Sequence, residues 1–312
     1  MAFKSSTFPS LPSSAAAYVE LTRLHRPLGT LVLFLPIVNG ILHSVAVTPY
    51  QLPTNQVLDC AIKWLLISAV WLAFGCVTDD VIDQDLDRKV LRCRNRPVAR
   101  GAISTTQGFI FAATLAIAFA VISLWSFPSP KFAWCLSIGI PGTLIYPFLK
   151  RFTNYAQLFL ALLYTSASFH ASRTVGFDVL HSGSLPLLRS NLSIMGALAL
   201  NNIILETIYM HADLEDDIKH GIGSLAVRIQ GSPKQVLFTL ALVYQILLII
   251  SGVSAGLDTY YFIGAVCASV SQLYCIAFVN LAGPKSCQQY FRVGNAIVGT
   301  FLALGLYADH AA

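Results

Sequence analysis

The chain has 312 residues, of which 55% are hydrophobic and 11% are charged, and its formal net charge is +5. An ordinary soluble domain carries about 25% charged residues, and no polar stretch of this sequence is long enough to form a separate soluble domain. The composition therefore excludes a soluble protein and predicts one integral membrane domain. The modest positive charge gives no reason to expect nucleic-acid binding.

The first 22 residues are polar and rich in serine and proline, so they predict a disordered tail ahead of a single transmembrane domain at 23–312. The tail has no apolar core segment, which argues against a secretory signal peptide. It holds one lysine and no arginine before Arg23, which is weak support for a mitochondrial address. We therefore expect a multi-pass protein of endoplasmic reticulum or Golgi membranes, in preference to the mitochondrial inner membrane.

Apolar stretches long enough to cross about 30 Å of hydrocarbon recur along the whole sequence. They predict nine transmembrane helices, at 28–45, 58–78, 106–126, 132–149, 153–172, 192–212, 235–255, 260–281 and 293–309. Sixteen of the twenty lysine and arginine residues fall in the tail and in the loops after the even-numbered spans. Because basic residues mark cytosolic loops, we expect this end of the helices to face the cytosol.

Nine of the fifteen acidic residues are concentrated in two short clusters, each at the basic end of a predicted span. In the first cluster Asp79, Asp83 and Asp87 recur every four residues. This spacing places them on one face of a helix that extends the second span, with Asp80 about a third of a turn away.

The second cluster repeats this pattern after the sixth span, with Asp213 and Asp217 four residues apart. The repetition suggests a site formed where two similar halves meet. Carboxylates are expensive at a bilayer boundary, and Mg²⁺ commonly bridges one or two carboxylates to the phosphates of a substrate. Ordinary charges at helix ends are the simpler alternative, but two matching clusters favour a magnesium site that holds a diphosphate.

Three ordered motifs resemble those of a known family. The segment DDVIDQDLDRKVLRCRNRP (79–97) is similar to NDxxDxxxD followed by a basic stretch that ends in RP. YPFLK (146–150) is similar to YxxxK, and YMHADLEDDIKHG (209–221) to YxxxDxEDDxxxG. With them the chain resembles the UbiA superfamily of intramembrane prenyltransferases, and most closely its fungal aromatic prenyltransferases of meroterpenoid biosynthesis. Asp79 stands where the family usually has Asn, which keeps an oxygen ligand and adds a negative charge.

The resemblance implies an all-α membrane protein with nine transmembrane helices in a bundle around a central cavity, and a polar cap that carries the two Asp-rich motifs. An isoprenyl diphosphate is expected to bind through Mg²⁺, with its tail in the apolar cavity. The implied catalytic metal ligands are Asp79, Asp83, Asp87, Asp213 and Asp217. Asp80 is implied as a supporting catalytic residue, and the implied diphosphate-binding residues are Arg23, Lys150, Arg96 and Tyr146.

The reaction implied is Mg²⁺-dependent transfer of an isoprenyl group, farnesyl in particular, from its diphosphate to an aromatic phenolic or polyketide acceptor in secondary metabolism. Two related enzymes stay open as alternatives, the 4-hydroxybenzoate polyprenyltransferase of ubiquinone biosynthesis and a membrane terpene cyclase. A cation transporter is the non-enzymatic alternative. The expected partners are the isoprenyl diphosphate, the acceptor and the bilayer, and nothing in the sequence indicates a protein partner.

Three titratable residues inside the predicted spans have open roles. Glu206 lies seven residues before Asp213 and so near the same helix face. Contact with the acceptor's hydroxyl, or relay of a proton, competes evenly with a structural hydrogen bond for this residue. His170 and His211 are expected to be structural histidines.

Overall fold

The computed structural model describes residues 12–128, 130–176, 178 and 183–312, and every regular element in these ranges is helical. The predicted all-α class is therefore confirmed. The long helices are α2 Pro27–Val47, α3 Thr54–Ile82, α5 Thr105–Ser126, α6 Pro130–Leu149, α7 Ala156–Ser172, α8 Leu185–Met210, α11 Pro233–Ala255, α12 Thr259–Phe278 and α14 Asn295–Ala311. The short ones are α1 Ser13–Thr22, α4 Gln84–Asp87, η1 Arg173–Val175, η3 His211–Asp213, α9 Leu214–His220, α10 Leu225–Arg228, α13 Pro284–Gln289 and η4 Tyr290–Gly294.

A helix covers each of the nine predicted spans, and seven helical segments of the described chain are long and apolar enough to cross a membrane. The helix α6 contributes a shorter apolar segment, Leu136–Leu149. The helix α7 has 17 residues, about 26 Å at 1.5 Å per residue, against about 30 Å of hydrocarbon. The chain is thus a multi-pass membrane protein, and the count of nine crossings remains a prediction.

Two helix termini illustrate why the elements begin and end where they do. The Ser104 hydroxyl accepts a hydrogen bond from the Gln107 N–H at 3.2 Å, and the Gln107 side chain accepts one from the Ser104 N–H at 2.9 Å. This capping box satisfies two backbone donors that lack a partner within α5. The helix α11 ends at Ala255 and is capped by Gly256, which adopts φ +68° without the penalty that a Cβ would bring.

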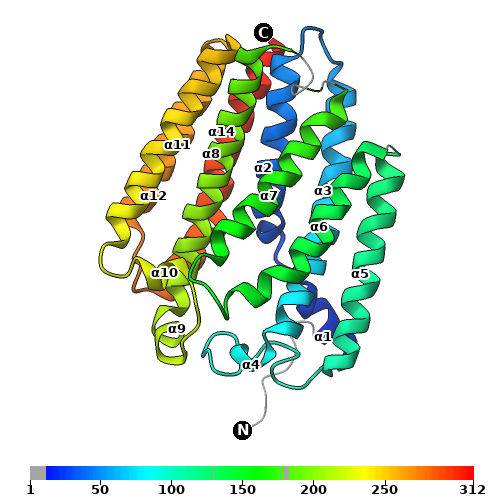
Figure 1. Cartoon of the computed structure of the whole chain (residues 1–312), viewed down its shortest axis with the longest axis vertical. Coiled ribbons are helices and arrows are strands. Elements are labelled where there is room, and N and C mark those ends of the chain that lie inside the picture. Colours follow the sequence, from blue (N-terminus) through cyan, green and yellow to red (C-terminus); the bar gives the residue numbers. More distant parts are fainter. Residues whose placement is uncertain (1–11, 129, 177, 179–182) are drawn as a thin grey trace.

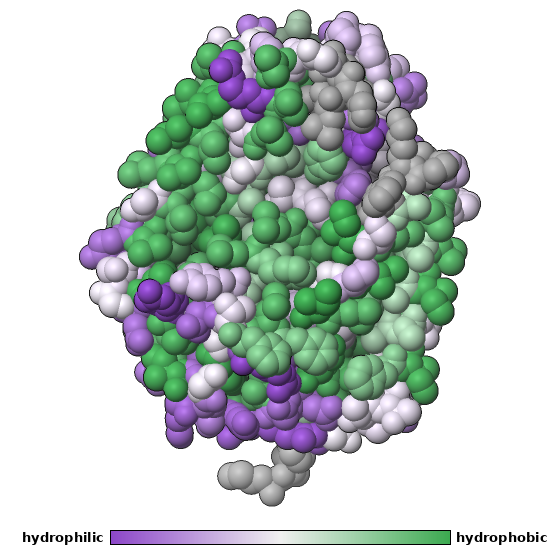
Figure 2. Space-filling model, in the orientation of Figure 1, coloured by the Kyte–Doolittle hydropathy of each residue, from purple (hydrophilic) through white to green (hydrophobic). Residues whose placement is uncertain are grey.

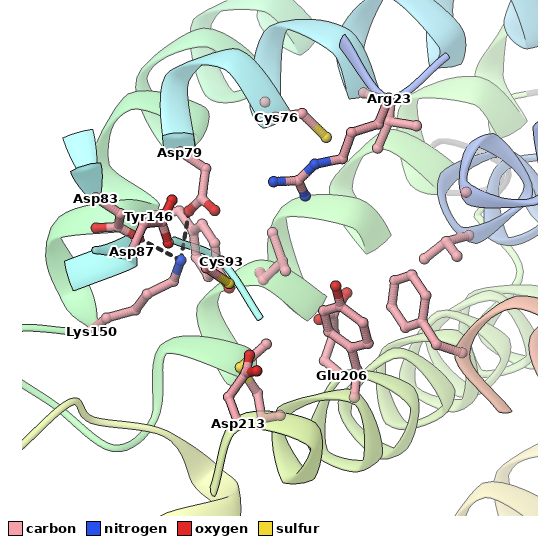
Figure 3. Close-up of a pocket in the computed structure, with 18 of the residues that line it drawn as sticks. Arg23, Cys76, Asp79, Asp83, Asp87, Cys93, Tyr146, Lys150, Glu206 and Asp213 are labelled. Atoms are coloured by element: carbon pink, nitrogen blue, oxygen red, sulfur yellow. Dashed lines mark hydrogen bonds and ion pairs between the residues drawn. The ribbon is translucent and has the colours of Figure 1, made fainter. Parts of the chain in front are cut away.

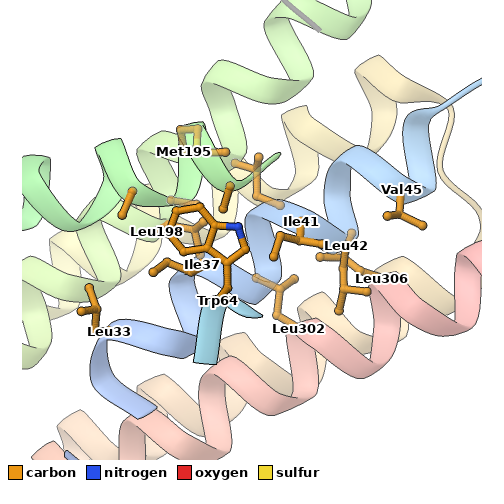
Figure 4. Close-up of a cluster of buried hydrophobic side chains, with 14 of the residues drawn as sticks. Leu33, Ile37, Ile41, Leu42, Val45, Trp64, Met195, Leu198, Leu302 and Leu306 are labelled. Atoms are coloured by element: carbon orange, nitrogen blue, oxygen red, sulfur yellow. The ribbon is translucent and has the colours of Figure 1, made fainter. Parts of the chain in front are cut away.

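The main core is built around α2, which packs against α3, α7, α8 and α14. Figure 4 shows Ile37 and Ile41 of α2 beside Trp64 of α3, with Leu198 of α8 and Leu302 of α14 close by. Each of these side chains is at most 3% exposed. Because α2 is held on several sides, Arg26, which directly precedes its first turn, is attached to a firmly packed helix.

The surface separates into an apolar band and a polar end. Figure 2 shows green apolar side chains over the middle of the molecule and purple polar ones gathered at the lower end. Large apolar side chains such as Trp125, Val253 and Phe278 are more than two-thirds exposed, which suits contact with lipid. In Figure 1 the short helices α1, α4, α9 and α10 lie together at the lower end, whereas α14 ends at the opposite one.

The expected disordered tail differs from the structure in its second half. Residues 1–11 lie outside the described residues, but Ser13–Thr22 form the helix α1. Its Ala17 and Leu21 are buried against Val77 and Val81 of α3, and Glu20 pairs with Arg100 at 2.8 Å. The run of three alanines favours a helix, and burial of its apolar side then holds that helix on the bundle.

Candidate functional site

A cavity of about 210 Å³ lies where the bundle meets its polar end. Its deep part is lined by apolar side chains of α2, α3 and α7, among them Leu33, Trp71 and Leu163. Its outer part is lined by both acidic clusters and by several arginines and lysines. The cavity therefore joins a charged mouth to an apolar interior. This distribution of polarity suits a ligand with an anionic head group and an apolar tail.

The first acidic row faces this cavity, although it is not carried by one continuous helix. The helix α3 ends at Ile82, Asp83 has φ −89° and ψ 9°, and α4 resumes at Gln84. The Asp83 N–H donates to the Asp79 carbonyl and the Asp87 N–H to the Asp83 carbonyl, both at 2.8 Å. These two bonds keep the helical spacing through the break, so Asp79, Asp83 and Asp87 all line the cavity as their spacing predicts.

The second acidic row lines the same cavity from the opposite half of the chain. Asp213 ends the short helix η3, and Asp217 lies in the first turn of α9. Both are buried, and the Ser224 hydroxyl donates to Asp217 at 3.2 Å. The rows, more than a hundred residues apart in sequence, thus meet around one space, as the repeated pattern predicts.

Lys150 holds two carboxylates of the first row. Its Nζ lies 2.6 Å from Asp79 and 2.7 Å from Asp83, as the dashed lines of Figure 3 mark. It also lies 5.0 Å from the centre of the Tyr146 ring, whose face favours a cation. Burial alone would lower the pKa of Lys150, but the two neighbouring carboxylates raise it well above its ordinary value. The side chain is therefore protonated and positively charged.

Gly223 brings Lys150 into place from the second half of the chain. The Gly223 N–H donates to the Lys150 carbonyl at 2.8 Å, which joins the loop after α9 to the loop after α6. A Cβ at position 223 would meet that carbonyl oxygen at 3.0 Å and would lie still closer to the backbone of Thr153. Only glycine allows this approach.

Asp80 is placed differently from the other predicted acids. It is 2% exposed, and it is not among the described residues that line the cavity. Its carboxylate lies 2.5 Å from Arg23 and 3.0 Å from Arg96, and both of these arginines do line the cavity. Arg96 also contacts Asp87 at 2.8 Å. Asp80 therefore anchors two cations at the edge of the cavity rather than facing its interior.

Arg92 is a residue that the motif comparison missed. It lines the cavity, and its guanidinium makes a two-pronged contact with the carboxylate of Asp213 and donates to the Tyr209 hydroxyl at 2.7 Å. Arg92 and Arg96 are four residues apart, whereas Arg94 between them is exposed. That spacing within the basic stretch was the available signal for Arg92.

Crowding and burial perturb the acids at the mouth. Burial raises the pKa of Asp83 to about 7, against the opposing effect of Lys150. Burial likewise raises the pKa of Asp87 to about 6, against the opposing effect of Arg96. By contrast, the hydrogen bonds from Arg151 lower the pKa of the more exposed Asp85 to about 2. Of the acids that face the cavity, Asp83 and Asp87 thus take up protons near neutral pH, whereas Lys150 overcomes the effect of burial and lowers the pKa of Asp79 to about 2.

The two acidic rows offer oxygen donors that a divalent cation could share. Within the described ranges no three Asp, Glu, His or Cys side chains are grouped closely enough to hold a metal ion. The rows are instead engaged by Lys150, Arg96 and Arg92. Yet the five carboxylates of the two rows line one space, and Asp83 Oδ1 has no hydrogen-bond partner among the described residues. This all-oxygen donor set fits Mg²⁺, provided that the cations move away from the carboxylates.

The three residues whose roles the sequence left open, Glu206, His170 and His211, differ in their position relative to the cavity. Glu206 lines the cavity and is 6% exposed. The buried His211 forms a 2.8 Å hydrogen bond to the Thr207 carbonyl, and His170 is buried at the end of α7 away from the cavity lining. The two histidines thus lie outside the site, whereas Glu206 belongs to it.

Comparison with known proteins identifies relatives over most of the chain. The model of the UbiA prenyltransferase family matches residues 29–304. Prenyltransferase stbC of Stachybotrys bisbyi is 32% identical over 309 residues, which cover 98% of this chain and 88% of the relative. DMOA farnesyltransferase nvfB of Aspergillus novofumigatus (strain IBT 16806) is 31% identical over 306 residues, 96% of this chain and 93% of the relative.

Solved structures share the fold at low sequence identity. The apo structure of a UbiA homologue from Aeropyrum pernix K1 has a TM-score of 0.69 at 20% identity and covers 89% of this chain and 97% of that one. A UbiA homologue from Archaeoglobus fulgidus bound to GPP and Mg²⁺ has a TM-score of 0.65 at 18% identity, over 95% of this chain and all of that one. The family suggested by the three motifs is confirmed.

Proposed function

Because this chain belongs to the UbiA prenyltransferase family, we propose that it transfers a farnesyl group from farnesyl diphosphate to an aromatic phenolic or polyketide acceptor in secondary metabolism. The single observation that carries the proposal is one cavity that joins two acidic rows to an apolar interior. The choice of farnesyl is supported by the name of a relative that is 31% identical, a farnesyltransferase. The fungal relatives also support a secondary-metabolic acceptor over a quinone precursor.

The proposed metal ligands are Asp79, Asp83, Asp87, Asp213 and Asp217, which together line the cavity mouth. Mg²⁺ held there supplies positive charge that stabilises the diphosphate as it departs. Two rows from separate halves of the chain let the site hold both phosphates of a diphosphate at once. Asp80 acts in this proposal through Arg23 and Arg96, which it fixes in position.

The cations that now engage the carboxylates are proposed to bind the diphosphate oxygens. Lys150, Arg23 and Arg96 all line the cavity, and Arg92 joins them as a fourth cation. Guanidinium groups bind phosphate through paired donors, and preorganised positive charge stabilises the leaving group most strongly where water is excluded. Tyr146 is assigned to keep the Lys150 ammonium over its ring.

The apolar part of the cavity is proposed to hold the isoprenyl chain. Leu33, Trp71 and Leu163 give it a dry lining, and exclusion of water protects the allylic cation that ionisation leaves. The acceptor ring then attacks carbon 1 of the isoprenyl group. We place the protein in endoplasmic reticulum or Golgi membranes, with α6 and α7 completing nine crossings and the acidic rows at the cytosolic side.

The test is to incubate membranes that contain the protein with Mg²⁺, farnesyl or geranylgeranyl diphosphate, and a panel of phenolic acids. We expect a prenylated acceptor and equimolar diphosphate, and no product after chelation of the metal. A cyclic hydrocarbon or terpenol from the donor alone would identify a terpene cyclase instead. Ion flux without diphosphate release would identify a transporter.

Magnesium binding is expected to weaken as the pH falls. Asp83 and Asp87, whose pKa values are raised to about 7 and about 6, must lose their protons before they can bind the metal. Protonation of these two carboxyls lowers the apparent affinity for Mg²⁺ about 20-fold between pH 8 and pH 6, and protonation of Asp217, whose pKa burial raises to about 7, lowers it about 10-fold more. Calorimetric titration with Mg²⁺ across this range, together with proton release measured in two buffers, checks the expectation.

The control for this titration is Asp85→Asn. The pKa of Asp85 is lowered to about 2, so the carboxyl stays ionised throughout the range and the variant should show the same pH dependence as the parent. An affinity that does not change between pH 8 and pH 6 would remove Asp83 and Asp87 from the metal site.

A further inference from the structure

One acidic side chain that lines the cavity has no role in the proposed binding of the metal and the diphosphate. Six acidic side chains line the cavity, and five of them belong to the two rows. The row acids are engaged by Lys150, Arg96, Arg92 or Ser224. Glu206 is the sixth, and among the described residues no hydrogen bond or ion pair to it is found.

Glu206 is a buried residue whose carboxyl is hydrogen-bonded to no side chain of the described residues. The residue is only 6% exposed, and it lies in the apolar helix α8, which is long enough to span a membrane. The Glu206 oxygens are not among the fully buried unpartnered atoms of the described residues, so they are open to the cavity, whereas a structural carboxyl would be hydrogen-bonded to the protein. Its oxygens are directed into the cavity, as Figure 3 shows beside Arg23 and Asp213. The missing partner is therefore a group that enters the cavity.

The depth of Glu206 selects which substrate supplies that group. Glu206 precedes Asp213 by seven residues along almost continuous helix, an axial offset of about 10 Å. Two carboxylates that share one Mg²⁺ hold their oxygens within about 4 Å of each other, twice the metal–oxygen distance, so an offset of this size keeps Glu206 from joining Asp213 around one cation. A diphosphate group would also be repelled by it. The isoprenyl chain has no polar atom to offer, which leaves the hydroxyl of the aromatic acceptor.

Resting on the proposed function, we propose that Glu206 binds the phenolic hydroxyl of the acceptor and takes its proton as the ring attacks. The C1–O bond of the isoprenyl diphosphate breaks, and its electron pair leaves with the diphosphate. A ring carbon forms the new bond to C1, and the hydroxyl proton passes to the Glu206 carboxylate, which leaves a neutral dienone. Loss of the proton from the substituted ring carbon and return of the Glu206 proton to the oxygen restore the phenol. One ring proton is released in all.

This assignment explains why the acid lies between the charged mouth and the apolar interior. A phenol is a much better carbon nucleophile as its O–H proton leaves, and a positioned base accelerates such a step about 10²- to 10⁴-fold. A base at the metal rows would be neutralised by the cations, whereas a base deep in the apolar part could not reach the ring. Glu206 also selects acceptors, because an acceptor that lacks the hydroxyl leaves the buried carboxylate unpaired.

The experiment compares Glu206→Gln with the parent enzyme, with an acceptor that carries a free phenol and with its methyl ether. We expect kcat with the phenol to fall about 10²-fold or more in Glu206→Gln, while the Kd for the donor with Mg²⁺ stays unchanged. With Mg²⁺ and donor saturating, so that protonation of the row acids no longer limits the rate, the acidic limb of the parent's kcat profile should be absent from this variant, and Glu206→Asp should recover part of the rate. The methyl ether should be a poor substrate for parent and variant alike, since the hydrogen bond to Glu206 is absent from both.

The matched control is Glu215→Gln, which removes the same charge from an exposed position outside the cavity lining and should keep the parent's kinetics. The inference is overturned if Glu206→Gln binds donor and retains the parent's kcat and pH profile, or if the loss in rate is equal for phenol and methyl ether. A parent enzyme that yields no prenylated acceptor, whatever Glu206 does, would instead overturn the proposed function. Loss of donor binding in Glu206→Gln would assign the residue to the fold of the cavity and also contradict the inference.

Discussion

Asp83→Ala and Asp217→Ala are each expected to lower kcat/KM for the donor by about 10³-fold or more, while the protein still inserts into membranes. Each removes one carboxylate from a different acidic row, and the positive charge held against the leaving diphosphate is then weaker or misplaced. Because the two rows are proposed to hold one ligand together, the double variant should be little worse than either single one. The measurement is product formation against donor concentration at saturating Mg²⁺.

The control for these variants is Asp85→Ala, which lies in the first cluster between Asp83 and Asp87. Its side chain is 53% exposed and pairs with Arg151 at 2.7 Å, outside the described lining of the cavity. Exposed pairs of this kind contribute about 0–1 kcal/mol, so the variant should remain active. Full activity of Asp83→Ala or Asp217→Ala would remove the corresponding row from the proposed mechanism.

Lys150→Met is expected to change two quantities in opposite directions. The affinity for Mg²⁺ without donor should rise, because a positive charge 2.6 Å from Asp79 and 2.7 Å from Asp83 no longer competes for their oxygens. The kcat/KM for the donor should nevertheless fall about 10²-fold, because a cation that would stabilise the departing diphosphate is lost. Calorimetry of Mg²⁺ binding and steady-state kinetics on the same preparation measure the two effects.

Arg151→Met is the matched control for this pair of measurements. Arg151 is the next residue in the chain, but its main partner is the exposed Asp85 at 2.7 Å, its distance to Asp83 is 3.7 Å, and it is not among the described cavity-lining residues. Both quantities should stay closer to those of the parent than in Lys150→Met. A Lys150→Met variant that loses Mg²⁺ affinity would mean that Lys150 supports the carboxylates structurally and does not compete with the metal.

Much of the candidate site could be predicted from the sequence, because the patterns that indicate it lie within short segments of the chain. The spacing of Asp79, Asp83 and Asp87 depends only on helical periodicity, and the structure keeps that spacing even where α3 stops at Ile82. The apolar runs that predict membrane helices are likewise properties of short windows. The motif around Lys150 pointed to the same cavity without any knowledge of how the helices pack.

The partners of these residues could not be read in the same way. Arg92 meets Asp213 across 121 positions of the chain, and Asp80 turns to Arg23 across 57. Which carboxylate receives which cation depends on the packing of helices from both halves, and similar arginines occur throughout the basic stretch. The isolation of Glu206 belongs to the same class, since a carboxyl is known to lack a partner only after its neighbours have been placed.

By itself, then, the sequence determined an all-helical membrane protein, its family and the two acidic rows, because hydropathy, helical period and motif spacing act over a few residues at a time. Only the folded structure shows that both rows line one cavity and that α1 packs on α3. It also shows that Asp80 pairs with two arginines, and that Glu206 lies unpaired between the charged mouth and the apolar interior of the cavity. These are contacts between segments distant in sequence, and their energies depend on burial and distance, which exist only once the helices have packed.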